Sequence, residues 1–218
     1  MRKLFLGLVS LIVPVFLLLT GLRLLLTPAF VELEYSLPGF PADSYGMPAA
    51  DRQRYALSAL DYLVNEEGIE FLGDQTFPDG APLYNQRELR HMHDVKQLTQ
   101  AVLNVWVGIT LASVALFLLA RRGGWSAELR SAIQQGGRLT VLLIAAILIL
   151  VVLSFDAIFV GFHRIFFEGD TWLFQYTDTL IRLFPMRFWQ DVFIAAGLLT
   201  ALGGLLLGWV WPRLKARG

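Results

Sequence analysis

The chain has 218 residues, of which 56% are hydrophobic and 17% are charged, and its formal net charge is zero. A neutral balance of charge gives no reason to expect a nucleic-acid partner. The chain has no cysteine, which excludes disulfides, a thiol nucleophile and a lipid-modified cysteine in this protein. Its length would suit one or two soluble domains, but its apolar share points to a membrane protein.

Four apolar segments are each long enough to cross a hydrocarbon layer of roughly 30 Å, which takes about 20 helical residues. They cover residues 4–26, 101–120, 139–162 and 192–211. We therefore expect an all-α polytopic membrane protein, a four-helix transmembrane bundle in which residues 1–218 form a single membrane domain. The segments between the spans are expected to form two outer loops, 27–97 and 163–190, and one inner loop, 121–138.

The first apolar segment could instead be a cleaved signal peptide, because Arg2 and Lys3 would provide its charged start. Its apolar run is about twice the length usual for a signal peptide, and no A-x-A-like cleavage site follows it. A retained span, kinked at Pro14, is therefore favoured.

The distribution of basic residues predicts the orientation. The two ends and the 121–138 loop together carry nine basic residues and one acid, Glu128. The basic residues are Arg2, Lys3, Arg121, Arg122, Arg130, Arg138, Arg213, Lys215 and Arg217. By contrast, residues 27–97 hold twelve acids and five bases. Since basic loops remain in the cytoplasm, we expect both termini inside and both outer loops on the extracytoplasmic face of a bacterial cytoplasmic membrane.

The first outer loop is expected to form a small folded cap. Hydrophobic and polar residues alternate over 31–36, which is typical of a short, half-buried strand. Residues 49–65 follow a helical pattern that ends before Gly68, and 69–72 is a candidate for a second short strand. A cap of about seventy residues is too small to bury a large core alone, so we expect it to lean on the second outer loop and the bundle.

A polar stretch at residues 84–96 runs directly into the second span. Asn85 is a candidate helix N-cap, and Glu88 stands three residues later, in the spacing of a capping box. Neither proline nor glycine interrupts residues 86–107, so one helix is expected to start outside and become the span. On this helix His91 shares a face with Glu88 and Asp94.

His91 and His93 raise the question of a metal site. On a helix the two side chains point about 160° apart and cannot bind one ion, whereas on a strand they could. Only His163 would remain as a further nitrogen ligand. We expect a helix, and therefore no metal and no cofactor.

The second outer loop is dense in aromatic residues. They are Phe162, Phe166, Phe167, Trp172, Phe174, Tyr176, Phe184, Phe188 and Trp189. Aromatic side chains gather at membrane interfaces, which accounts for most of them. A hairpin lining a lipid-entry slot is compatible with the same composition.

Two histidines therefore stand at the outer ends of spans. Carboxylates near each ring, Glu88 and Asp94 for His91 and Asp156 for His163, would fix its tautomer and suit it to general acid-base chemistry. Two such rings would have to bracket one substrate group, at roughly 4–8 Å from each other. Neither a G-x-S-x-G elbow nor an H-E-x-x-H motif is present, so a covalent serine mechanism has no support.

Three motifs resemble one family. Residues 84–96 are similar to a motif N-x-R-E-x-x-H-M-x-D-V-K of a bacterial integral membrane family, the one that includes the lipoprotein intramolecular transacylase Lit. Residues 162–167, followed by Trp172, and residues 183–189 match further family motifs. The resemblance covers nearly the whole chain, and its two histidine motifs are its specific part.

The resemblance implies an acyltransferase that moves the sn-2 acyl chain of a diacylglyceryl-cysteine lipoprotein to the cysteine α-amine, giving the lyso form. It implies His91 and His163 as catalytic residues and His93 as a variable position. The positioning residues it implies are Tyr84, Asn85, Glu88, Asp94 and Trp172. The expected partners are membrane lipids and the lipoprotein, and we expect a monomer. The alternative is a non-catalytic envelope protein, a sensor or assembly partner that binds through its extracytoplasmic cap.

Overall fold

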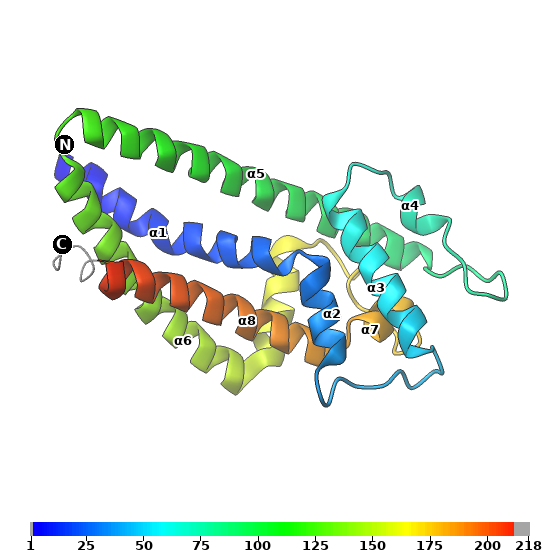
Figure 1. The fold of residues 1–218 in the computed structure, drawn as a ribbon. Helices are drawn as coiled ribbons and strands as arrows, with labels where there is room; N and C mark the ends of the chain where they lie inside the picture. Colours follow the sequence, from blue (N-terminus) through cyan, green and yellow to red (C-terminus); the bar gives the residue numbers. More distant parts are fainter. Residues whose placement is uncertain (1, 212–218) are drawn as a thin grey trace. The chain divides into compact units, whose positions relative to one another are not determined.

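The structure, a computed structural model, describes residues 2–211, and this part of the chain is helical (Figure 1). The elements are α1 (Arg2–Leu25), α2 (Pro28–Ser36), α3 (Ala49–Val64), α4 (Glu70–Gly73), α5 (Gln86–Arg122), α6 (Ser126–Phe166), α7 (Thr179–Leu183), α8 (Met186–Leu205) and the π-helical segment η1 (Leu206–Val210). Pairing of extended chain within these residues is limited to one isolated bridge between Thr76 and Pro82. The all-α fold is confirmed, while the basic tail residues Arg213, Lys215 and Arg217 lie outside the described part.

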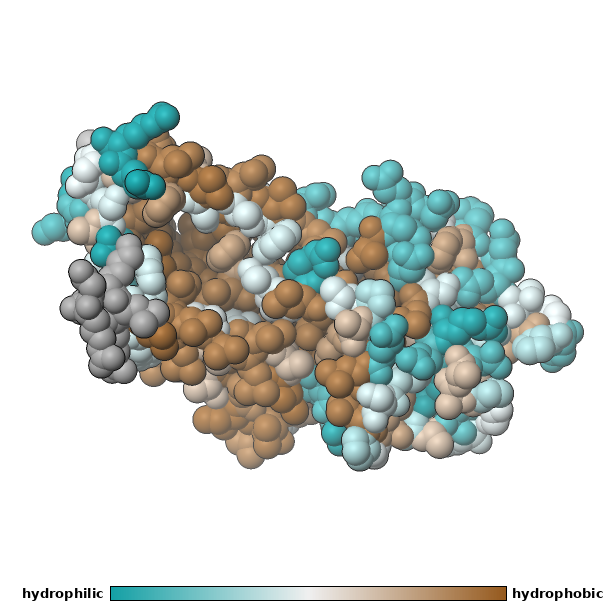
Figure 2. All heavy atoms as spheres, in the orientation of Figure 1, coloured by the Kyte–Doolittle hydropathy of each residue, from teal (hydrophilic) through white to brown (hydrophobic). Residues whose placement is uncertain are grey.

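Four helices are long and apolar enough to cross a membrane: α1, α5, α6, and α8 together with η1. Each overlaps one of the four predicted spans, and α1 and η1 end one residue before the predicted boundaries. Large apolar side chains on these helices are exposed, among them Leu111 on α5 and Leu142 and Val152 on α6. Figure 2 shows the resulting brown, apolar surface over the long helices. Such faces are stable only against lipid, so the protein is membrane-integral.

The helices divide into two compact units, and unit 1 comprises residues 2–25, 102–153 and 193–211. Glycines allow its helices to approach closely. A Cβ added at Gly137 would stand 2.7 Å from the Gly208 nitrogen and 2.8 Å from the Gly204 carbonyl oxygen. One added at Gly136 would meet the Val13 Cβ at 2.6 Å. Small residues at these crossings therefore set the packing of unit 1, as is usual between membrane helices.

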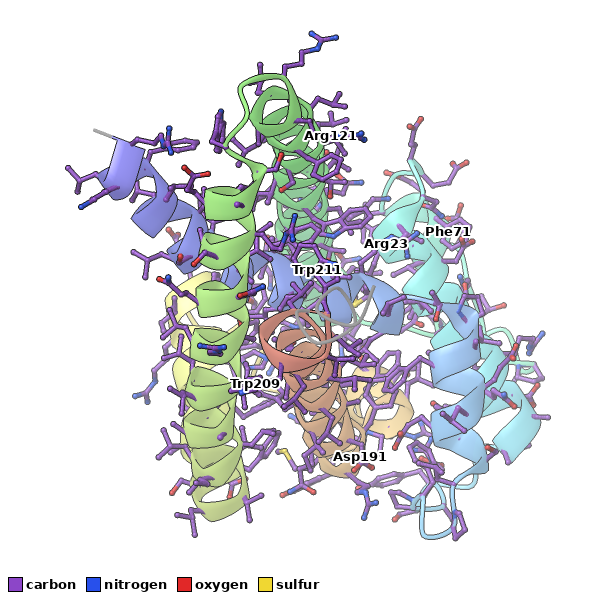
Figure 3. All side chains as sticks on the ribbon, turned by 60° about the vertical axis from the view of Figure 1, so that its left-hand side comes forward. Arg23, Phe71, Arg121, Asp191, Trp209 and Trp211 are labelled. Atoms are coloured by element: carbon purple, nitrogen blue, oxygen red, sulfur yellow. The ribbon has the colours of Figure 1, made fainter. Side chains whose placement is uncertain are left out.

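Polar contacts within unit 1 also join helices. The Ser10 hydroxyl donates to the Ala132 carbonyl at 2.9 Å, and the Trp106 indole N–H donates to the Thr20 hydroxyl at 3.1 Å. At the end of the fourth span, the Arg138 guanidinium lies over the ring of Trp209, 5.7 Å from its centroid (Figure 3).

Unit 2 comprises residues 26–101 and 154–192, and it contains a core of its own. The largest fully buried apolar side chains in this core are Val31, Tyr62, Leu72, Leu83 and Leu183. At its edge the ring of Phe71 stacks on Tyr62 with the centroids 6.4 Å apart (Figure 3). The core therefore draws on α2, α3, α4, α7 and the segment before α5.

Two predicted strands are wrong. Residues 31–36 lie in α2, which starts with Pro28 at its first turn, a position that proline favours. Residues 70–73 form α4, a single helical turn that buries Leu72. The helix predicted over 49–65 is confirmed as α3.

The third predicted span, 139–162, is interrupted. The backbone of α6 leaves helical geometry at Ser154, with φ −150° and ψ 49°. The segment that follows, which carries His163, belongs to unit 2. Neither proline nor glycine stands at this position, so the break has no local signal in the sequence.

Candidate functional site

The N-terminus of α5 is held by the predicted capping box. The Asn85 side-chain oxygen accepts hydrogen bonds from the backbone N–H groups of Arg87 and Glu88, at 2.9 and 3.1 Å. In return the Glu88 carboxylate accepts from the Asn85 backbone N–H at 2.8 Å. Three otherwise unpaired backbone donors are satisfied, and the start of the helix that bears His91 is fixed.

The same two residues tie α5 to α7. The second oxygen of Glu88 accepts from the Leu180 backbone N–H at 2.7 Å, and the Asn85 amide donates to Asp178 at 3.0 Å. Beside them, the Thr179 hydroxyl donates to the Leu83 carbonyl at 2.5 Å. Glu88 is 1% exposed, and all of its bonds go to backbone N–H groups. Asn85 and Glu88 therefore position helices, and neither bonds to an imidazole.

His91 on α5 and His163 in the last turn of α6 face each other. Their ring centroids are 6.0 Å apart and the ring planes differ by 21°. Each residue is only 8% exposed. The predicted spacing of 4–8 Å between the two imidazoles is confirmed, and at this distance both rings can reach one reacting group.

The tautomer of His163 follows from its hydrogen bond. Its Nδ1 lies 2.7 Å from the carbonyl oxygen of Phe159, one turn earlier on α6. A carbonyl oxygen can only accept, so Nδ1 carries the proton and Nε2 of the neutral ring carries the lone pair. A backbone carbonyl thus orients this ring, where Asp156 was predicted to do so. Asp156 is exposed.

Aromatic rings enclose the pair. The rings of Phe167 and Phe174 meet His91 edge-on, with centroids at 4.9 and 5.3 Å. The rings that contact His163 are Phe159 at 4.2 Å, Trp172 at 4.9 Å, Phe167 at 5.5 Å and Phe162 at 5.6 Å. Part of the aromatic loop therefore surrounds the imidazoles in addition to the interfacial role expected of it.

Three buried polar atoms of the predicted site residues have no hydrogen-bond partner in the described structure: Nδ1 of His91, Nε1 of Trp172 and the hydroxyl of Tyr84. Leaving a buried polar group unpaired costs about 1–3 kcal/mol, so such atoms invite a functional explanation. Tyr84 lies in the core of unit 2, whereas Trp172 and His91 belong to the aromatic enclosure.

In the described structure Asp94 makes no hydrogen bond to His91, so its predicted role in orienting that ring stays a prediction. Together with Arg90 and the exposed His93 it lines a surface groove of ≈ 470 Å³. His93 is hydrogen-bonded to Gln97 at 2.8 Å. His93 and the buried His91 point to different sides of the helix, as the helical repeat requires. Asp94 lines the same groove as His93.

Sequence reasoning missed several contributors to the site. The role of the Phe159 carbonyl as the partner of His163 could not be predicted, because every residue of a helix has a backbone carbonyl group. The sequence predicts Phe167 and Phe174 as aromatics of the membrane interface or of a lipid-entry slot, and Phe167 also lies in a motif that matches the family. The guanidinium of Arg87 donates to the Leu173 carbonyl at 2.8 Å and holds the loop next to Trp172. Only the aromatic density of the loop signalled these roles.

Fold and site together define a membrane-integral, four-span helical protein with a buried pair of histidines. The family model for the lipoprotein intramolecular transacylase Lit matches residues 6–189. The chain belongs to this family.

The chain is also similar to individual proteins. An uncharacterized protein of Aquifex aeolicus (strain VF5) is 30% identical over 210 residues, covering 95% of this chain and 93% of its own. The in meso structure of the membrane integral lipoprotein intramolecular transacylase Lit from Bacillus cereus has a TM-score of 0.64 at 18% identity, covering 99% of this chain and 98% of its own. A point mutant of that protein gives a TM-score of 0.55 at 18% identity, over 99% and 94% of the two chains. At this identity the structural likeness concerns the fold.

Proposed function

We propose that this protein is a membrane transacylase that moves the sn-2 acyl chain of a diacylglyceryl-cysteine lipoprotein to the α-amine of the same cysteine. The observation that carries the proposal is the pair of buried imidazoles, His91 and His163, at 6.0 Å within an aromatic enclosure. Family membership supports the substrate class.

The reaction needs two proton acceptors, because the α-amine enters as an ammonium ion with a pKa of about 8. No carboxylate contacts either ring in the described structure, and we take both imidazoles to be neutral at rest. The first ammonium proton goes to His91, which frees the nitrogen lone pair to attack the ester carbonyl carbon. The second proton leaves the nitrogen in the tetrahedral intermediate and goes to Nε2 of His163, the ring nitrogen with the lone pair.

Collapse of the intermediate completes the transfer. The bond between the carbonyl carbon and the glycerol oxygen breaks, and the departing alkoxide takes the proton held by His91. The products are an amide, a free hydroxyl group and one proton on His163, which passes to water. The atoms and charges of this reaction balance, and no covalent intermediate between the acyl chain and the enzyme is needed.

The aromatic rings around the two histidines contribute the positioning of the substrate and the exclusion of water. Amine and ester belong to one molecule, so catalysis depends on holding them in attack geometry. Rings packed around two histidines that are each 8% exposed also keep water from competing for the acyl group. A monomer is sufficient, because both histidines come from one chain.

We place the site at the extracytoplasmic face of the bacterial cytoplasmic membrane, with both termini in the cytoplasm. The charge distribution of the loops supports this orientation, since the loop preceding His91 is acidic and the 121–138 loop is basic. Diacylglyceryl lipids of the outer leaflet would then reach the site laterally.

The test is mass spectrometry of the N-terminal peptide of a diacylglyceryl lipoprotein from a host that lacks such an activity. Expression of this chain should convert the peptide to the lyso form with an N-acylated cysteine. His163→Ala should lower the conversion rate by at least about 100-fold. Unmodified diacyl peptide in cells that contain the folded wild-type protein would refute the proposal and favour a non-catalytic envelope protein.

A further inference from the structure

We propose that the indole N–H of Trp172 is the hydrogen-bond donor that stabilises the oxyanion formed on the ester carbonyl. The inference rests on the proposed function and adds to it a catalytic residue with a defined atom. Acyl transfer through a tetrahedral intermediate needs such a donor, and removing one typically costs about 10²–10³ in kcat.

The first observation is the unpaired indole nitrogen. Nε1 of Trp172 is buried and has no hydrogen-bond partner in the described structure. Buried tryptophans usually find an acceptor for this N–H group, because leaving it unpaired is unfavourable. An acceptor that is present only during the reaction accounts for the unpaired donor.

The second observation is position. The Trp172 ring contacts His163, with the centroids 4.9 Å apart and the planes 36° apart. His163 in turn faces His91. The indole therefore lies beside one of the two imidazoles that would bracket the ester.

The third observation is the chemistry of the enclosure. In the described structure, the rings that contact His91 or His163, besides those of the two histidines themselves, belong to Phe159, Phe162, Phe167, Phe174 and Trp172. Of these, only the indole has an N–H group, since the others are phenylalanines. A negative charge that develops among phenyl rings is strongly unfavourable without a donor.

The step assigned to Trp172 involves no net proton transfer. Attack of the amine nitrogen moves the carbonyl π electrons onto oxygen, and the indole N–H donates a hydrogen bond to that oxygen. When the carbon–oxygen bond to glycerol breaks, the electron pair returns to re-form the carbonyl. Nε1 keeps its proton throughout, so its contribution should not depend on pH.

The experiment replaces the N–H group while keeping the shape. Benzothienylalanine at position 172 exchanges N–H for sulfur in the same bicyclic ring, and Trp172→Phe removes the donor with a smaller ring. Each purified variant is assayed on a synthetic diacylglyceryl-cysteine peptide. We expect kcat to fall by about 100-fold in both, with KM within about threefold and an unchanged shape of the pH profile.

Trp125→Phe is the matched control, because Trp125 packs on Phe5 in unit 1 and should retain wild-type kcat. A benzothienylalanine variant with wild-type kcat would overturn the assignment of Trp172. A shifted pH profile would instead indicate that the ring only positions His163, which also overturns it. If the wild-type protein yields no lyso product, the proposed function itself fails, so the two failures are distinguishable. Should the analogue not fold, the kcat of the phenylalanine variant decides.

Discussion

His91 and His93 are two residues apart on α5, yet one is buried among rings and the other is exposed. We expect His91→Ala to lower the transacylation rate by at least about 100-fold, because a proton carrier is lost. His93→Ala should remain within about twofold of wild type, since its only hydrogen bond in the described structure goes to Gln97. The measurement is the initial rate of lyso-peptide formation by purified variants. Equal losses in both would contradict the two-histidine mechanism.

Glu34 on α2 is a buried acid, 2% exposed, and its Oε1 has no hydrogen-bond partner. Burial and the adjacent carboxylate of Asp191 raise the pKa of Glu34 from 4.5 to about 7. Asp191 itself is paired with Arg187. The folded protein therefore keeps a proton on Glu34 that the unfolded chain releases.

This proton makes stability depend on pH. Between pH 4.5 and about 7 the folded state binds more protons at Glu34 than the unfolded state, so stability falls as the pH rises through this window. The loss should not exceed about 3 kcal/mol. Thermal midpoints in detergent should be higher at pH 5 than at pH 8, and Glu34→Gln should reduce this difference because an amide cannot ionise. An equal difference in both proteins would show that other groups cause it.

At the scale of elements, the link from α5 to α7 depends on one carboxylate. Glu88→Gln turns one acceptor oxygen into an NH₂ group that faces a backbone N–H, of Asn85 or of Leu180. We expect about 1–3 kcal/mol of destabilisation, together with a lower transacylation rate as the start of α5 loosens. Thermal unfolding and activity are measured on the same preparation. Glu66→Gln, at an exposed acid of unit 2, is the control and should change neither.

The elements that the sequence predicted well are those with a local cause. The four spans follow from long apolar runs, and the start of α5 follows from the spacing of Asn85 and Glu88. The alternation over 31–36 fits a period of two and so predicts a strand, but the segment lies in the helix α2. In α2 the buried residues are Val31 and Glu34, which share one face of a helix. An acidic residue in a sequence is expected at the surface. The burial of Glu34 could not be predicted without knowing that Asp191 lies next to it.

Other features of the site depend on residues far apart in the chain. The bond from Leu180 to Glu88 joins residues 92 positions apart, and no local pattern announces it. The proximity of His91 and His163 could be predicted only because the orientation expected from the basic residues puts both at the same end of their spans. Asp94 shares a helical face with His91, but a shared face does not by itself make a contact, and its role in positioning stays a prediction.

For the whole molecule, the orientation in the membrane can be tested directly. A reporter fused at Arg130 should be cytoplasmic, because the 121–138 loop is basic, and one inserted at Asp74 should be extracytoplasmic. Alkaline phosphatase and green fluorescent protein fusions at each position provide complementary readouts. A cytoplasmic Asp74 would place the histidine pair on the wrong side for an outer-leaflet substrate.

The discontinuity of unit 2 has a consequence for biosynthesis. Its core combines Val31 and Tyr62 from the first part of the chain with Leu180 and Leu183 from a much later part. While the ribosome is still making residues 102–153, the early half has no partner for its apolar face, and Glu88 lacks the Leu180 N–H. Such long-range closure is slow. The core of unit 2 and the histidine pair can therefore close only after residues 154–192 have been made, so the site forms late in the assembly of the chain.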